Sequence, residues 1–293
     1  MRTNIEFKTT DDTVLRGWHY LPVEPGPHPT IIMAHGLGAV KEMYLDRYAE
    51  VFARAGLAAI VYDHRNFGAS DGVPRQEIDP WLQVRDYSDA ITFALSLKQT
   101  DPNRIGIWGS SYGGGHVLVV AAIDRRVKCV VSQIPLISGS AYLHGRFSSE
   151  AIAQLNVRFH GDRVHRAAGG PPGMVPIVSS DDPTRRDAYD WYTQAASAYA
   201  PSWRNEVTLR SIEYIAGYEP GAYTGLISPV PLLLIAAQND HLPLNIAEAA
   251  FERARDPKKL VVLPCGHWEP YTTLFDQSSA PACNWFCEHL QRR

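Results

Sequence analysis

The feature that most limits the possible folds is a regular alternation of short apolar runs with longer amphipathic segments. The short runs have the length of buried strands, and the segments between them repeat apolar residues with the period of an α-helix. Strands that alternate with helices form a mostly parallel sheet with helices on both faces. The first strands are expected at 5–8, 15–20, 30–34, 57–62, 105–108 and 127–131, and the helices at 41–55, 80–98 and 112–123, with a turn at 101–103.

The alternation breaks after the sixth expected strand and returns near the C-terminus. Between 138 and 228 there is no clear strand pattern, but a Gly- and Pro-rich run at 169–173 and seven of the chain's fourteen tyrosines. We therefore predict one α/β core made of residues 1–137 and 229–293, split by an insertion that spans 138–228. The elements expected after the insertion are strands at 231–237 and 259–263 and helices at 245–255 and 272–290.

Composition excludes several classes of function. The 293 residues carry a formal net charge of -3, so we expect no nucleic acid and no membrane as partner, because both favour a concentrated positive field. No apolar run is long enough to span a bilayer, and the first residues lack the apolar segment of a secretory signal. The four cysteines show no metal-binding spacing and no G-x-G-x-x-G loop is present. We expect reduced thiols in the cytoplasm, with no metal and no cofactor.

The strongest chemical signal is Gly109-Ser110-Ser111-Tyr112-Gly113, a G-x-S-x-G motif. It follows an expected buried strand and opens an expected helix, which is the context that this motif requires. Glycines avoid backbone collisions in so tight a turn, and the serine hydroxyl stands above the sheet near a helix N-terminus. The alternative is a tight glycine turn with a buried capping serine. The context favours Ser111 as a nucleophile.

With this motif the chain resembles the α/β-hydrolase superfamily, over nearly all of its length outside the insertion. The matching segments are 35–38 (HGLG), 62–72 (YDHRNFGASDG) and 108–115 (WGSSYGGG). Within the superfamily the chain is similar to the dienelactone-hydrolase-like branch, especially the hydrolases and polyketide acyl transferases of secondary metabolism. The resemblance implies a mostly parallel sheet of eight strands flanked by helices, with a helical cap inserted between strands six and seven.

The resemblance also implies a catalytic triad in the chain order serine, acid, histidine. A serine hydroxyl needs an adjacent base, and a carboxylate must orient that base. Asp240 follows the seventh expected strand and is the predicted acid; its alternative role is to cap the next helix. His267 follows the eighth strand and is the predicted base; its alternative is a histidine in a surface loop. His241, next to the acid, is expected to point away from the serine.

Acyl transfer needs hydrogen-bond donors for the oxyanion that forms on the substrate carbonyl. The resemblance assigns these to the backbone N–H groups of Tyr112 and Leu37, and the second assignment is open to a shift of one residue. The other histidines near the site, His35 and His64, are expected to shape turns and hold loops by hydrogen bonds rather than transfer protons.

The insertion is rich in aromatic side chains, which suits the binding of extended or cyclic acyl groups. We expect it to determine acyl specificity, so that replacing Trp191 or Trp203 alters substrate ranking more than reaction with a small probe. The alternative is that most of its aromatic residues form the core of the cap itself. Its arginines at 163–166 and 185–186 place positive charge near a possible entrance to the site. They are expected on solvated surface; the alternative is that they bind a carboxylate or a carrier-bound phosphopantetheine.

These observations predict a cytoplasmic serine hydrolase that cleaves a carbonyl ester, thioester or lactone through an acyl-serine intermediate. The main alternative is an acyltransferase that moves a polyketide-type acyl group to a hydroxyl acceptor. Cleavage of a C–C bond and a non-catalytic binding protein are further alternatives. The expected partner is a small-molecule acyl substrate or a carrier-bound thioester, and the oligomeric state is left open.

Overall fold

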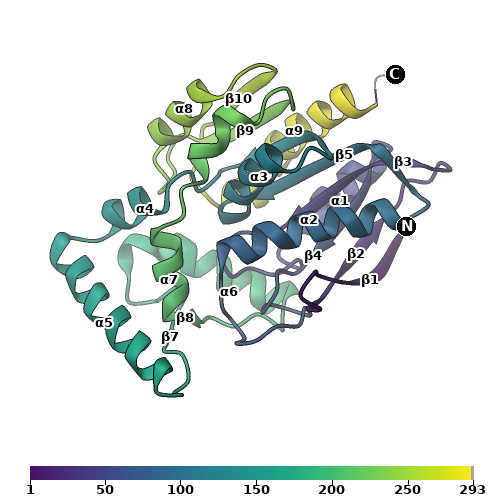
Figure 1. The fold of residues 1–293 in the computed structure, drawn as a ribbon. Coiled ribbons are helices and arrows are strands. Elements are labelled where there is room, and N and C mark those ends of the chain that lie inside the picture. The colour runs from purple at the N-terminus through teal and green to yellow at the C-terminus, as the bar shows by residue number, and fades with distance from the viewer. Residues whose placement is uncertain (292–293) are drawn as a thin grey trace.

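A computed structural model describes residues 1–291, and its centre is one sheet of eight strands (Figure 1). The strand order is β1-β2-β4-β3-β5-β6-β9-β10. The first two strands form an antiparallel hairpin that joins the sheet antiparallel to β4, and all other neighbours are parallel. The strands are β1 (Arg2–Lys8), β2 (Val14–Tyr20), β3 (His28–Ala34), β4 (Ala58–Tyr62), β5 (Thr100–Ser110), β6 (Val127–Gln133), β9 (Leu232–Ala237) and β10 (Lys258–Leu263). The expected eight-stranded sheet is confirmed.

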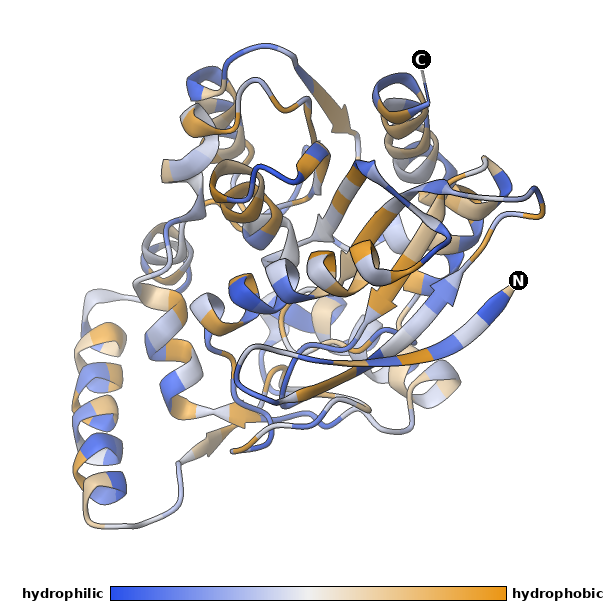
Figure 2. Cartoon of the chain, turned by 45° about the vertical axis from the view of Figure 1, so that its right-hand side comes forward, coloured by the Kyte–Doolittle hydropathy of each residue, from blue (hydrophilic) through white to orange (hydrophobic). Residues whose placement is uncertain are grey.

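Helices cover both faces of this sheet. On one face α1 contacts α9, and on the other α2 contacts α3. Every residue of β3, β4 and β9 is buried, which is why residues 31–34 of β3 and all of β4 and β9 form continuous apolar runs rather than alternating ones. Figure 2 shows the same arrangement as hydrophobic central strands under helices of mixed hydropathy. The helices of the core are α1 (Leu45–Arg54), α2 (Pro80–Ser96), α3 (Tyr112–Ile123), α8 (Leu244–Arg253) and α9 (Phe275–Leu290).

Several expected bounds in the core differ from the structure by three residues or more, among them the start of the last helix, which is Phe275 rather than 272. Two of these differences have a local cause. The helix expected from residue 41 begins at Leu45. Lys41 lies outside it because its backbone N–H and its ammonium both donate to Asp63, just after the end of β4. The turn expected at 101–103 lies inside β5, where the pairing with β3 shifts register. The side chain of Asp101 accepts a hydrogen bond from the N–H of Asn103, so a local turn is accommodated within the strand.

The insertion between β6 and β9 is mostly helical. It has one short ladder, β7 with β8, that the sequence pattern did not indicate. The long helix α5 extends away from the sheet in Figure 1, and it exposes Val157 and Val164. None of the helices within residues 1–291 has the length and apolar character needed to cross a membrane. The elements of the insertion are α4 (Gly139–Arg146), α5 (Ser149–Ala167), β7 (Met174–Val175), η1 (Pro183–Arg185), α6 (Arg186–Tyr199), β8 (Val207–Thr208), α7 (Leu209–Ala216) and η2 (Pro220–Leu226).

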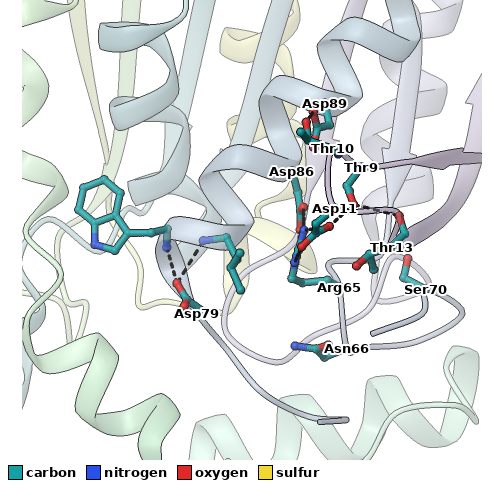
Figure 3. Close-up of polar contacts among 12 residues, drawn as sticks. Thr9, Thr10, Asp11, Thr13, Arg65, Asn66, Ser70, Asp79, Asp86 and Asp89 are labelled. Atoms are coloured by element: carbon teal, nitrogen blue, oxygen red, sulfur yellow. Dashed lines mark hydrogen bonds and ion pairs between the residues drawn. The ribbon is translucent and has the colours of Figure 1, made fainter. Parts of the chain in front are cut away.

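A buried ion-pair network ties the hairpin, the loop after β4 and α2 together (Figure 3). The guanidinium of Arg65 donates to both oxygens of Asp86 on α2, at 2.8 and 2.5 Å. It also donates to Asp11 in the hairpin turn at 2.7 Å. At the start of α2, Asp79 caps the first backbone N–H groups. These contacts hold the 62–72 segment, which runs beside the carboxyl ends of the strands.

Candidate active site

Ser111 lies in a strained turn between β5 and α3. Its φ of 57° and ψ of -119° are rare for a residue with a side chain. The flanking glycines make the turn possible, because a Cβ at Gly109 would lie 2.1 Å from the carbonyl oxygen of Gly113. A Cβ at Gly113 would lie 2.6 Å from the carbonyl oxygen of His35. Residues larger than glycine therefore do not fit at positions 109 and 113, as the motif suggested.

The structure brings Ser111, His267 and Asp240 together from three different strand ends. Nε2 of His267 lies 2.9 Å from Oγ of Ser111. Nδ1 of the same ring lies 2.9 and 2.8 Å from the two carboxylate oxygens of Asp240. Because a carboxylate only accepts, this contact places the proton on Nδ1 and leaves Nε2 free to accept from the serine hydroxyl. The arrangement has the geometry of a nucleophile, a base and an orienting acid.

Neither alternative role for the acid and the histidine agrees with the structure. Helix α8 begins at Leu244 without a side-chain cap, so Asp240 does not cap it; its carboxylate instead accepts from the N–H of Leu242 at 2.9 Å. His267 is only 2 % exposed, so it is not a surface histidine. Both side chains are withdrawn from solvent, which strengthens the electrostatic contact between them.

Two backbone N–H groups beside the serine are available to a ligand. Tyr112 is the first residue of α3, so its N–H has no partner within the helix. Leu37 lies in the loop after β3, and Gly36 in this loop approaches Ser111 so closely that an added Cβ would lie 2.9 Å from the serine Cβ. Within residues 1–291 neither N–H donates to another group. Both residues line the cavity that contains Ser111.

The insertion forms one wall of that cavity. The space above Ser111 is about 50 Å³ and is shared by side chains of the core and of the insertion. A second, more apolar cavity of about 190 Å³ lies next to it. Four residues line both spaces, namely Leu37, Tyr142, Ile177 and Ile215. An acyl group at Ser111 therefore has an apolar space beside it, under helices of the insertion.

Two residues in the cavity were not expected there. His241 was expected to point away from the serine, and this is wrong: its ring lies 4.3 Å from the ring of His267, and it lines the cavity with Ser111. Burial and the nearby cationic groups lower the pKa of His241 far below its usual value, so this ring stays neutral. Arg185, expected on solvated surface, also lines the cavity. Its neighbour Arg186 is solvated as expected.

The histidines near the site that were expected to be structural are buried and hydrogen-bonded. His35 accepts from the N–H of Gly36 through Nδ1, at 2.7 Å, and its Nε2 lies 2.8 Å from the carbonyl oxygen of Met43. His64 donates from Nε2 to the carbonyl of His35 at 3.1 Å. Burial lowers the pKa of His35 to about 4 and that of His64 to about 3. Both rings therefore stay uncharged at neutral pH.

Within residues 1–291, one group of side chains has the composition of a metal site. Donor atoms of Asp240, His241 and His267 all lie within 4.8 Å of one another. The two ring nitrogens of His267 already contact Asp240 and Ser111. A metal ion bound through this histidine would have to displace one of those contacts, so the group fits proton transfer better than metal binding.

Comparison with known proteins places the chain among hydrolases and acyl transferases. The sequence profile of the X-Pro dipeptidyl-peptidase (S15) family matches residues 11–269. A thiohydrolase of Eupenicillium brefeldianum is 31 % identical over 88 % of this chain and 84 % of its own length. The quorum-quenching protein AidA of Acinetobacter baumannii is 36 % identical, over 79 % and 76 %. A polyketide transferase of Stachybotrys chlorohalonatus is 30 % identical, over 89 % and 88 %. The crystal structure of the α/β hydrolase GrgF from Penicillium sp. sh18 superposes with a TM-score of 0.87 at 26 % identity and covers both chains completely.

Proposed function

The chain belongs to the X-Pro dipeptidyl-peptidase (S15) family, whose fold is that of the α/β hydrolases, and from this premise we propose that Ser111, His267 and Asp240 form the catalytic triad of a hydrolase acting on acyl thioesters and related esters. The observation that carries the proposal is the unbroken line of contacts from Ser111 through His267 to Asp240. The preference for a thioester rests on relatives that are named thiohydrolases.

In the first step the Ser111 hydroxyl attacks the acyl carbonyl carbon. A bond forms between Oγ and that carbon, the hydroxyl proton moves to Nε2 of His267, and the carbonyl oxygen becomes negative. The N–H groups of Tyr112 and Leu37 donate to this oxyanion. Asp240 stabilises the imidazolium that has formed without taking its proton.

The tetrahedral intermediate then collapses. The carbon–sulfur bond, or the carbon–oxygen bond of an ester, breaks and the leaving group receives the proton from His267. Water attacks the acyl-Ser111 carbonyl while His267 removes one of its protons. The bond to Oγ breaks, the serine recovers its proton, and a carboxylic acid leaves.

Acyl transfer is the second candidate, and relatives named polyketide transferase and acyltransferase favour it. The same acyl-Ser111 would then react with a hydroxyl group of a second substrate in place of water, giving an ester. The two outcomes are separated by supplying hydroxyl acceptors and measuring the ratio of ester to free acid among the products.

The proposed substrate is a small acyl thioester, either free or held on a carrier, because the space beside Ser111 is confined and largely apolar. The proposed compartment is the cytoplasm. All four cysteines are free, which suits a compartment that keeps thiols reduced.

Covalent labelling with a fluorophosphonate tests the nucleophile. The wild type should be labelled and should hydrolyse acyl thioesters, whereas Ser111→Ala should lose the label and on the order of 10⁶ in kcat. Ser110→Ala is a matched control, since its hydroxyl contacts Tyr271 rather than His267 and it should still be labelled. Labelling of Ser111→Ala, or its retained turnover, would refute the proposed nucleophile.

A further inference from the structure

Arg185 is a charged side chain in the candidate active site to which the proposed mechanism gives no task. It is the last residue of the short helix η1, just before α6, and its side chain lines the same cavity as Ser111 and His267. One guanidinium nitrogen, Nη1, donates to the hydroxyl of Tyr142 at 3.2 Å. Its Nε is buried and has no hydrogen-bond partner within residues 1–291. The contact with Tyr142 therefore orients the guanidinium but leaves its hydrogen-bonding capacity partly unused.

In the part of the chain that the structure describes, no carboxylate forms an ion pair with this guanidinium. The nearby Asp182 binds Arg146 at 3.1 Å and accepts from the hydroxyl and N–H of Thr184. Asp240 is engaged by His267. No acidic residue lines the cavity among the residues that the structure describes. Since His241 is neutral, the Arg185 guanidinium is the charged group of this cavity wall, and Asp182, which interacts with it electrostatically, is already paired with Arg146.

The adjacent arginine shows that the absence of a partner is particular to this position. Arg186 is mostly exposed and pairs with Asp190 one helical turn away, at 2.9 Å. A charge that is partly withdrawn from water without a partner is unfavourable, and a bound anion removes that cost. A carboxylate matches the planar fork of a guanidinium especially well.

We propose that Arg185 binds a carboxylate carried by the acyl group, so that the enzyme selects dicarboxylic half-thioesters over simple fatty acyl thioesters. Tyr142, which orients the guanidinium, also lines the apolar cavity beside Ser111. In this proposal the methylene part of the acyl chain lies against the apolar side chains that line both spaces, such as Ile177 and Ile215, while its distal carboxylate meets Arg185 in the space that contains Ser111. This inference rests on the proposed acyl chemistry at Ser111.

A matched pair of substrates tests the proposal. The adipoyl and hexanoyl thioesters of N-acetylcysteamine have equal chain lengths and differ only in a terminal carboxylate. The wild type should favour the adipoyl thioester in kcat/KM, and Arg185→Gln should lower the adipoyl-to-hexanoyl ratio roughly ten- to hundredfold, as expected when a charge-assisted hydrogen bond is lost. Arg185→Lys should keep part of the preference, since it keeps the charge but not the fork. Arg186→Gln is the matched control and should leave the ratio unchanged.

A binding measurement separates this inference from the proposed chemistry. In the Ser111→Ala background, calorimetry should show tighter binding of the adipoyl than of the hexanoyl thioester, and the added Arg185→Gln change should remove the difference. If the wild type hydrolyses neither thioester but this binding preference is present, the proposed function fails and the role of Arg185 stands. If thioesters are hydrolysed but Arg185→Gln leaves the ratio and the binding preference unchanged, or the wild type disfavours the adipoyl group, the role of Arg185 is refuted.

Discussion

Ser111 keeps its strained backbone because the chain around it leaves no relaxed alternative. Its N–H donates to the carbonyl of Gln133 at 2.9 Å, and its own carbonyl accepts from the N–H groups of Gly115 and Leu136 at 3.2 and 2.9 Å. Backbone strain of this kind costs about 1–3 kcal/mol and persists only where several contacts hold it. The three hydrogen bonds thus keep the hydroxyl directed at His267 before any substrate arrives.

The buried neutral histidines predict a loss of stability in mild acid. His64 and His35 have pKa values lowered by burial from 6.5 to about 3 and about 4. Between those values and 6.5 the unfolded chain binds protons that the folded chain does not, so the free energy of unfolding should fall as pH drops through this window. Each histidine contributes a slope on the order of 1.4 kcal/mol per pH unit.

Urea unfolding at a series of pH values, compared between the wild type and His64→Gln, measures the contribution of one ring. The glutamine amide can still donate to the His35 carbonyl but does not titrate. The variant should therefore show a shallower loss of stability between pH 6.5 and about 4. An unchanged slope would contradict the assigned role of His64.

Helix α6 connects the insertion to the loop after β3. Tyr192 on this helix donates its hydroxyl to the carbonyl of Leu37 at 2.5 Å, and Trp203 beyond its end donates Nε1 to the carbonyl of Gly38 at 3.1 Å. The rings of Tyr192 and Trp203 stack with centroids 5.5 Å apart. The insertion therefore holds the loop that carries the proposed oxyanion donor, in addition to forming a wall of the cavity.

Removing the Tyr192 hydroxyl should slow the chemistry more than it weakens binding. In Tyr192→Phe the ring still packs, but the Leu37 carbonyl loses a hydrogen bond worth about 1 kcal/mol. We expect kcat on acyl thioesters and the fluorophosphonate labelling rate to fall roughly fivefold, with a smaller change in KM. The control is Tyr199→Phe on the same helix, since that side chain is 57 % exposed. A fall confined to KM, or an equal fall in the control, would contradict this positioning role.

The same contacts change the effect that we expect from replacing the tryptophans of the insertion. The sequence led us to expect that replacing Trp191 or Trp203 would alter substrate ranking more than labelling by a small probe. Neither residue lines the two cavities near Ser111. Trp203 holds the loop at Gly38, and Trp191 packs on Trp268 with ring centroids 4.7 Å apart. For Trp203 we now expect the labelling rate itself to fall.

The molecule as a whole depends on ion pairs that join distant parts of the chain. Arg65, after β4, binds Asp86 on α2 and Asp11 in the hairpin turn. Asp86 is fully buried, whereas the side chain of Asp11 is 50 % exposed. One arginine thus connects the antiparallel edge of the sheet to a helix on its face (Figure 3).

This difference in burial predicts unequal effects on global stability. Asp86→Ala leaves a buried guanidinium without its main partner and should cost about 3–5 kcal/mol in the free energy of unfolding. Asp11→Ala removes a half-exposed partner of the same guanidinium and should cost about 1 kcal/mol or less. Denaturant unfolding of both variants gives the comparison. Equal losses would contradict the claim that the burial of Asp86 sets the larger cost.

The core was predictable because its signals are local or periodic. The helix expected at 112–123 has those bounds in the structure, and each expected strand has a counterpart in the sheet. Asp240 and His267 could be chosen because the resemblance implies the chain order serine, acid, histidine, with the acid and the histidine just beyond the last two strands. Parallel strands end on the same edge of a sheet, so such residues can meet there. The start of α1 was missed because it depends on Asp63, a residue outside the helix itself. The division into a core and a cap, and the role of each site residue, stay predictions.

What the sequence determined by itself was the α/β pattern and the turn at Ser111, because apolar periodicity and backbone sterics act between residues that are near in the chain. Only the tertiary structure decided which side chains of the insertion reach the site. Arg185 and Arg186 are neighbours in sequence with the same side chain, yet one lines the cavity of Ser111 and the other pairs with Asp190 in solvent. The packing of α6 against the loop after β3 determines which of the two arginines faces the cavity. The contacts that fix this packing join residues far apart in the chain, such as Tyr192 and Leu37.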